Sequence, residues 1–244
     1  MSNDGLVPDW PAPPRVRAFT TTRQGGVSPA PYASLNLGGH VGDAPQAVAA
    51  NRTQVVRQLG LPGMPLWLNQ VHGITVVDAA HAAPGCAADA SFTREPGVVC
   101  AVLTADCLPL LLCDKAGSTV AAVHAGWRGL AAGVIEVTLA AMQVPPEDLM
   151  VWLGPAIGPH AFEVGSEVRE AFTSHDSAAA EAFHPSSAGC WLADIYQLAR
   201  QRLARQGVTA VYGGERCTYT EAQHFYSYRR DDVTGRMASL IWIE

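Results

Sequence analysis

The chain has 244 residues, of which 48% are hydrophobic and 16% are charged. This length allows a full hydrophobic core, and the composition is that of a globular protein rather than a disordered one. The net charge of −6, the pI of about 5.7 and the lack of a Lys- or Arg-rich run argue against nucleic acid as a partner.

Two further features bear on the expected compartment. The first five residues lack the basic and apolar regions of an export signal, and the sequence has no run of eighteen apolar residues that would predict a membrane span. The six cysteines are scattered without the spacing of a disulfide framework, a pattern typical of reduced thiols. We therefore expect a cytoplasmic protein without a membrane partner.

The N-terminal half is expected to contain several strands and one helix. The expected elements, in chain order, are a strand at 16–22, an extended segment at 34–37, a helix at 45–59 and strands at 67–70, 75–77 and 98–104. The helix begins at Pro45, a residue favoured in the first helical turn, and ends before Gly60.

The C-terminal half continues this mixture. The expected elements are strands at 108–113 and 119–123, a helix at 130–142, a strand at 149–153, helices at 164–172 and 194–206, a strand at 208–212 and a hairpin of 225–230 with 237–243 around the turn 231–235. Near-continuous apolar runs such as 108–113 predict strands buried on both faces. The Ala/Ser-rich segment 174–189 is expected to be a mobile surface segment. Together these patterns predict one mixed α/β domain over residues 1–244.

Three metal-capable side chains follow or precede predicted strands, next to Gly or Pro. These are His72, Cys107 and His124, two imidazoles and one thiol. This set suits Zn²⁺ with its fourth position open for water or substrate, as in catalytic zinc sites. The gaps of 35 (107 − 72) and 17 (124 − 107) residues exceed those of structural zinc motifs. The tertiary fold must therefore assemble the site, and the alternative is a buried core cysteine with two unrelated loop histidines.

Arginine suits phosphate because its guanidinium binds an anion bidentately. The candidates for binding phosphate or another part of the substrate are Arg23, Asn36, Arg52, Asp106, Arg128 and Arg229. Arg128 lies four residues from His124, between two glycines, and Asp106 precedes Cys107, where it could orient a ligand imidazole or simply cap a turn. Each arginine has the alternative of a solvated surface charge. The aromatic residues Trp127, Phe225, Tyr226 and Tyr228 could stack on a purine or pack in the core.

Eight segments in the same order resemble one known family. Three of them are Asn69-Gln70-Val71-His72-Gly73, Ala105-Asp106-Cys107-Leu108-Pro109 and Val123-His124-Ala125-Gly126-Trp127-Arg128-Gly129, and the others are 21–28, 34–38, 153–158, 225–230 and 234–237. This combination resembles the YfiH family, also called the laccase-domain or polyphenol oxidase family. The resemblance runs from about residue 15 to the C-terminus.

The resemblance implies a zinc-dependent purine nucleoside phosphorylase that acts on adenosine, inosine, guanosine and 5′-methylthioadenosine and also deaminates adenosine. It implies that His72, Cys107 and His124 bind the metal and act in catalysis. It also implies mixed β-sheets sandwiched by helices, a fold shared with cysteine-deamidase toxins. Purine nucleosides and phosphate would be the partners, whereas the sequence indicates no oligomeric state.

Three other functions remain open at the level of sequence. A Cys107–His124 nucleophile–base pair would make the protein a hydrolase of amides in cell-wall precursors, a peptidoglycan-editing role associated with the family. The older family name suggests a polyphenol oxidase, but the eight histidines form no H-x-H pair, so Cu²⁺ is expected only as a substitute at the zinc site. The third possibility is a binding module without catalysis.

Overall fold

The computed structural model describes residues 5–187 and 189–244. Residues 1–4, on which part of the expectation about an export signal rests, and residue 188, within the expected mobile segment, lie outside the described residues. Among the residues it describes, no helix has the length and apolar character needed to cross a membrane.

Two β-sheets form the centre of the molecule. The smaller sheet is antiparallel and consists of β1 (Val16–Thr20), β12 (Met237–Ile243) and β4 (Val99–Thr104), in that order. The larger sheet is mixed and consists, in order, of β11 (Ala210–Gly213), β7 (Leu149–Leu153), β5 (Leu108–Asp114), β6 (Val120–Ala125), β3 (Ala90–Thr93) and β2 (Val76–Asp78). In the larger sheet β7–β11 and β2–β3 are parallel and the other pairs antiparallel.

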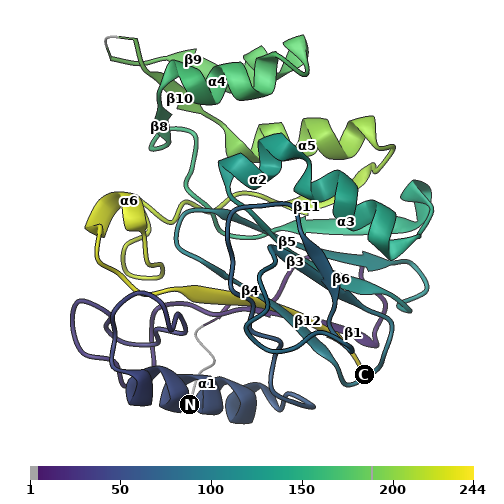
Figure 1. Cartoon of the computed structure of the whole chain (residues 1–244), viewed down its shortest axis with the longest axis vertical. Coiled ribbons are helices and arrows are strands. Elements are labelled where there is room, and N and C mark those ends of the chain that lie inside the picture. The colour runs from purple at the N-terminus through teal and green to yellow at the C-terminus, as the bar shows by residue number, and fades with distance from the viewer. Residues whose placement is uncertain (1–4, 188) are drawn as a thin grey trace.

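Helices cover the outer faces of both sheets, as Figure 1 shows. α1 (Pro45–Leu59) lies under the smaller sheet, and the larger sheet is covered by α2 (Trp127–Ala132), α3 (Val134–Met142) and α5 (Ile195–Arg205). Beyond these lies a small unit made of β8 (Glu163–Val164), α4 (Ser166–Thr173), β9 (Phe183–Pro185) and β10 (Trp191–Ala193). Short helical turns are η1 (Pro146–Asp148), η2 (Ser177–Ala182) and α6 (Tyr228–Asp231). This is the expected mixed α/β fold with sheets between helices.

Alternating side chains explain the layered order. In β4, Val99, Ala101 and Leu103 belong to the cluster that includes Val55 of α1, whereas Cys100 and Val102 pack toward the larger sheet. Since successive side chains of a strand point to opposite faces, a fully apolar strand must be covered on both sides. All seven residues of β5 and all seven of β12 are buried, which agrees with the near-continuous apolar runs in the sequence.

Four expected elements differ in the structure. The hairpin is wrong, because 228–231 form α6 and β12 pairs instead with β1 and β4. The expected helix 130–142 is divided by Gly133, whose φ of 103° ends α2 and begins α3. The expected strand 67–70 makes only one isolated bridge, between Asn69 and Ala87, and β3 was not expected. Within 174–189, η2 and β9 are ordered elements with buried Ala179 and Ala182, so the expectation of a mobile surface segment is wrong there.

Asn51 of α1 anchors the loop that precedes this helix. Its side chain is fully buried, accepts a hydrogen bond from Val27 N and donates to Ser28 Oγ and to the carbonyl oxygens of Ser34 and Asn36. One amide therefore fixes both ends of the segment 27–36. The expected extended segment 34–37 forms no strand, and these bonds hold it as an ordered loop.

Replacing Asn51 with alanine should lower the free energy of unfolding by about 2–4 kcal/mol, because several buried polar groups lose their partners. Urea unfolding followed by circular dichroism measures this change. Thr53→Ala, on the exposed side of the same helix, is the matched control and should change stability by less than about 0.5 kcal/mol. An Asn51→Ala variant as stable as the control would show that Asn51 does not anchor the loop.

Candidate metal centre

The strand register brings Cys107 and His124 to the same edge of the larger sheet. Cys107 directly precedes β5, and His124 lies near the end of β6, which runs antiparallel to β5. In the register, Leu108 pairs with Ala125 and Pro109 with His124. The start of one strand therefore meets the end of its neighbour, although seventeen residues separate the two side chains in sequence.

Asp89 brings His72 to the same place. It directly precedes β3, and its backbone carbonyl accepts a hydrogen bond from His124 N (2.7 Å). Its carboxylate, fully buried, accepts hydrogen bonds from the backbone N–H groups of Val71 (3.3 Å), His72 (2.9 Å) and Gly73 (2.7 Å). The loop that carries His72 is thus held by one carboxylate. His72 itself has a φ of 60°, an uncommon conformation for a residue other than glycine or asparagine.

The same carboxylate orients the second imidazole. Asp89 Oδ1 lies 2.8 Å from Nδ1 of His124, whose side chain is 3% exposed. Because an ionised carboxylate only accepts hydrogen bonds, Nδ1 must carry a proton, and once the imidazole is neutral its lone pair is on Nε2. A histidine held in this way by a carboxylate is the usual arrangement around protein metal ions.

The three candidate ligand atoms converge. The ligand atoms of His72, Cys107 and His124 all lie within 4.8 Å of one another, and Cys107 Sγ lies 3.9 Å from His72 Nε2. The two imidazole rings meet edge to face, with their centroids 4.8 Å apart. His72 is exposed, Cys107 is half-buried and His124 is buried, so the group opens to solvent on the His72 side.

Gly126 forms one wall of this group. A Cβ at this position would lie 2.9 Å from His72 Cδ2, 3.1 Å from Cys107 Sγ and 3.6 Å from His124 Cε1. Its φ of −64° and ψ of 157° are open to any residue, so the close approach of three side chains, and not the backbone conformation, favours glycine here.

The charges within the group favour a thiolate. Burial alone would raise the pKa of the Cys107 thiol, but the positive charge of His124 and hydrogen bonds from His124 and His72 lower it to about 6. Burial likewise opposes a charged His124, but the Cys107 thiolate and the hydrogen bond with Asp89 raise the pKa of that imidazole. Burial would also raise the pKa of Asp89, yet the bonds from His124, Gly73 and His72 lower it. A thiolate with two imidazoles is a donor set that fits Zn²⁺.

The four candidate arginines lie on different parts of the molecule. Arg52 donates from Nε and Nη2 to the carbonyl oxygen of Leu37 and stacks 4.4 Å over Trp67. Arg128 is exposed and stacks over Trp127.

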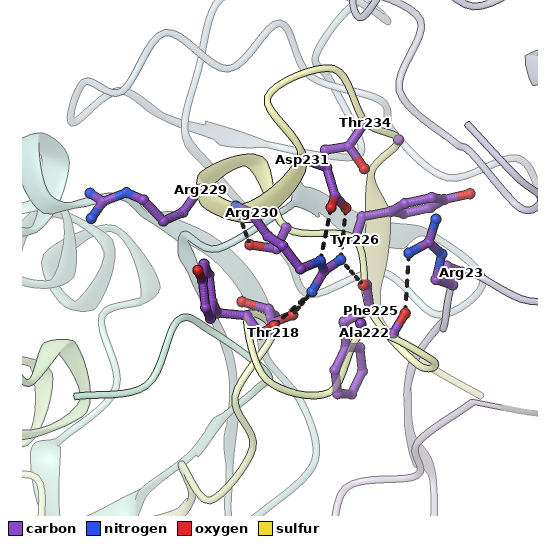
Figure 2. A network of polar contacts seen from close by, with 12 residues as sticks. Arg23, Thr218, Ala222, Phe225, Tyr226, Arg229, Arg230, Asp231 and Thr234 are labelled. Atoms are coloured by element: carbon purple, nitrogen blue, oxygen red, sulfur yellow. Dashed lines mark hydrogen bonds and ion pairs between the residues drawn. The ribbon is translucent and has the colours of Figure 1, made fainter. Parts of the chain in front are cut away.

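Figure 2 shows the other two arginines at the C-terminal loop. Arg23 donates from Nη1 to the carbonyl oxygen of Ala222 (3.1 Å) and stacks over Tyr226. Arg229 extends away from the network that its neighbour Arg230 forms with Asp231, and its Nη1 donates to the carbonyl oxygen of Glu163. Each of these guanidiniums thus has a structural partner.

Asp106 and Asn36 shape loops. The Asp106 carboxylate accepts hydrogen bonds from Thr218 Oγ1, Ser227 Oγ and the N–H of Arg229, which ties the turn before Cys107 to the C-terminal loop. These contacts correspond to the turn-capping alternative for Asp106 rather than to an imidazole partner.

Asn36 is fully buried and uses both ends of its amide. Oδ1 accepts from the N–H groups of Gly38 and Arg236, and Nδ2 donates to Asp43 and to the carbonyl oxygen of Gly38.

Three of the four aromatic candidates pack in the core, and one is exposed. Phe225 and Tyr226 are fully buried core residues, and Trp127 packs against the main core. Tyr228 is 55% exposed and therefore open to a ligand.

Sequence reasoning missed three residues near the centre: Asp89, His40 and Arg236. Asp89 stands alone in the run Ala87-Ala88-Asp89-Ala90, and a lone carboxylate among small apolar residues is a signal for a buried, hydrogen-bonded acid. Burial and then the positive charges of Arg236, Arg52, His124 and His72 lower the pKa of His40. Arg236 was part of a resembling segment, but nothing in its spacing indicated the centre.

Comparison with known proteins gives a consistent result. Residues 17–244 match the family model described as multi-copper polyphenol oxidoreductase laccase. A purine nucleoside phosphorylase from Pseudomonas aeruginosa is 57% identical over 243 residues, 99% of each chain. The purine nucleoside phosphorylase YfiH from Escherichia coli (strain K12) is 56% identical over 241 residues, 98% of each chain.

Solved structures agree with these relatives. The crystal structure of a Neisseria meningitidis protein, 56% identical, superposes with a TM-score of 0.96 over 99% of both chains. That of the Bacillus licheniformis protein YfiH, 30% identical, gives a TM-score of 0.88 over 94% of this chain and 93% of its own.

Fold and site together define an α/β protein in which two histidines and one cysteine that could hold a metal ion meet at the ends of neighbouring strands. Its sequence and its fold match the same set of relatives over nearly their whole length. The chain belongs to the YfiH family, to which the laccase-type family model also refers.

Cys107→Ala should leave the protein folded but largely free of metal, because two imidazoles without the thiolate bind Zn²⁺ weakly. Elemental analysis of protein purified without chelator measures zinc and copper per chain, with about one zinc expected in the wild type. Cys217→Ala, a half-buried cysteine elsewhere, is the matched control. Full zinc content in Cys107→Ala would refute the assignment of this ligand.

Asp89→Asn should weaken zinc binding by about 10- to 100-fold, since an amide nitrogen would face N–H donors and release the His124 imidazole. Competition with a chromogenic chelator measures the affinity. Asp114→Asn is the control, because Asp114 is also a buried carboxylate that accepts loop N–H groups, at the opposite end of β5. It should lose stability but keep its zinc affinity, and an equal loss of affinity in both variants would argue against a specific role for Asp89.

Proposed function

We propose that the chain is a zinc-dependent purine nucleoside phosphorylase that also deaminates adenosine. Its substrates would be adenosine, inosine, guanosine or 5′-methylthioadenosine together with phosphate. The observation that carries the proposal is the His72–Cys107–His124 group, whose ligand atoms lie within 4.8 Å of one another and which is exposed on the His72 side. Four relatives covering nearly the whole chain at 51–57% identity bear the name purine nucleoside phosphorylase.

Phosphorolysis requires a phosphate held against the ribose. An oxygen of phosphate forms a bond to C1′ while the C1′–N9 bond breaks, and the electron pair leaves with the purine, which takes up a proton. Zn²⁺, held by His72, Cys107 and His124, would supply a Lewis acid that polarises a bound oxygen. Guanidinium groups would hold the phosphate dianion, and the exposed ring of Tyr228 is available to contact the sugar or the base.

Deamination of adenosine uses the same opening without phosphate. Water adds to C6 as the bond to the 6-amino nitrogen breaks and ammonia departs. The Asp89–His124 pair would keep the imidazole in one orientation during this step, because its Nδ1 proton is fixed by the carboxylate. The half-buried position of Cys107 and the exposed His72 leave one side of the group open to a base.

A cysteine hydrolase is a second candidate, since the pKa of Cys107 is lowered toward 6 beside His124. A thiolate–imidazolium pair could attack an amide of a cell-wall precursor. His72 distinguishes the two functions, because a nucleophile–base pair needs only one imidazole whereas a metal centre needs both. Zinc in stoichiometric amount and a requirement for His72 would favour the phosphorylase.

Zinc-loaded enzyme with adenosine and phosphate should yield adenine and ribose 1-phosphate, and without phosphate it should yield inosine and ammonia slowly. Liquid chromatography of the mixtures separates these products. His124→Ala should lower both activities by about tenfold or more, since one metal centre would serve both. His81→Ala, an exposed histidine, is the control.

Two outcomes would count against this function. Adenine release that does not depend on phosphate would exclude phosphorolysis. Loss of only one activity in His124→Ala would mean that the two reactions do not share the centre.

A further inference from the structure

Two arginines enclose the loop 37–40 beside the metal centre. Arg52 of α1 donates from Nε and Nη2 to the carbonyl oxygen of Leu37, at 3.0 and 2.8 Å. Arg236 comes from the segment before β12, and its backbone carbonyl accepts a hydrogen bond from Leu37 N. A Cβ on Gly38 would lie 2.7 Å from Arg236 Cγ, so only glycine lets this side chain pack against the loop.

The loop and both arginines lie within electrostatic reach of the metal ligands. Burial and the positive charges of Arg236, Arg52, His124 and His72 lower the pKa of His40. Burial lowers the pKa of Arg236, while the negative charges of Cys107 and Asp106 act in the opposite direction. The positive groups of the loop and the candidate ligands therefore influence one another electrostatically.

Both guanidinium groups have N–H donors that are not engaged in hydrogen bonds within the described residues. Arg236 uses Nη1 for the carbonyl oxygens of Thr234 and Gly235, and Arg52 uses Nε and Nη2. Within the part of the chain that the structure describes, Nε and Nη2 of Arg236 and Nη1 of Arg52 have no hydrogen-bond partner, and neither arginine forms an ion pair with a carboxylate. The Nε–Nη2 edge is the side of a guanidinium that binds an oxyanion with two parallel hydrogen bonds.

Half-buried positive charge without a carboxylate favours a bound anion. Moving two guanidiniums out of water costs free energy that an anion in contact with them offsets. Two other arginine candidates differ in this respect. Arg128 is exposed and stacks over Trp127, and Arg229 donates to the carbonyl oxygen of Glu163 in the small unit that contains β8.

We propose that Arg236 and Arg52, together with the loop Gly38-Gly39-His40, form the phosphate subsite of this enzyme, with the Nε–Nη2 edge of Arg236 as its bidentate anchor. The proposal rests on the proposed phosphorylase function and assigns one of its two substrates to a place. Arg52 supplies a second positive charge through Nη1, held in place by Trp67 and the carbonyl oxygen of Leu37. Gly38 lets the Arg236 side chain pack against the loop, and a Cβ on Gly39 would lie 3.9 Å from Nη2 of Arg52, so the two side chains border neighbouring residues of the loop.

The test compares phosphate binding and turnover in zinc-loaded wild type, Arg236→Met and Arg52→Met. Calorimetric titration with inorganic phosphate should show an affinity about tenfold or more weaker in each variant, as expected for the loss of charge-assisted hydrogen bonds. In phosphorolysis of adenosine, the KM for phosphate should rise by a similar factor, and by more than the KM for adenosine.

Two further variants complete the design. Arg236→Lys keeps the charge without the fork, so its phosphate affinity should lie between those of the wild type and Arg236→Met, and it provides a folded protein if the methionine variant is unstable. Arg57→Met removes an exposed arginine from the same helix as Arg52 and should bind phosphate like the wild type.

The outcomes separate this subsite from the function on which it rests. Phosphate-dependent adenine release in the wild type with undiminished phosphate affinity in Arg236→Met and Arg52→Met would overturn the subsite alone, and would indicate phosphate bound by the metal only. A wild-type enzyme that neither binds phosphate nor releases adenine would overturn the proposed function and the subsite together.

Discussion

The buried carboxylate of Asp89 accepts hydrogen bonds from both histidine-bearing segments of the metal centre. A carboxylate without solvent contact is unfavourable unless its oxygens are fully engaged, so the loop before β2 and the imidazole on β6 must both take the positions that satisfy it. The uncommon backbone conformation of His72 persists under this constraint, because three successive N–H groups point to the same acid. The positions of the candidate metal ligands thus depend on a residue that is not itself among the three.

The candidate metal ligands and the arginines come from different layers of the fold. The larger sheet supplies the ligands at one edge, through strands whose antiparallel register fixes Cys107 against His124. The smaller sheet and α1 supply positive charge through Arg236 and Arg52, which are held by backbone carbonyl groups rather than by acids. The proposed site between the two layers would therefore combine a metal ion that activates an oxygen atom with guanidinium groups that bind phosphate.

Much of this fold could be predicted from sequence, and particular residues show why the rest could not. Apolar runs such as 108–113 and the helix that starts at Pro45 depend on local patterns, and the structure confirms them. The partner of β12 depends on contacts more than a hundred residues away, so a nearby turn motif suggested a hairpin that tertiary pairing overrides. The candidate ligands could be named because Gly- and Pro-flanked motifs carry them. Arg236 acts through loop packing, which no local pattern records. The lone Asp89 among small apolar residues signals a buried acid, but its partners come from segments that are distant in sequence.

The strand β12 lies in the middle of its sheet, between β1 and β4. The loops at the two ends of the sequence also meet directly, through the bond from Arg23 N to the carbonyl oxygen of His224 and the bond from the Tyr226 hydroxyl to the carbonyl oxygen of Tyr32. During synthesis, β1 and β4 leave the ribosome without the strand that joins them. A chain without β12 therefore leaves the edges of β1 and β4 that face it unpaired, and the segment that carries Arg236 has no strand to hold it. Fragments that end before β12 would contain all three candidate metal ligands yet lack the central strand of the smaller sheet.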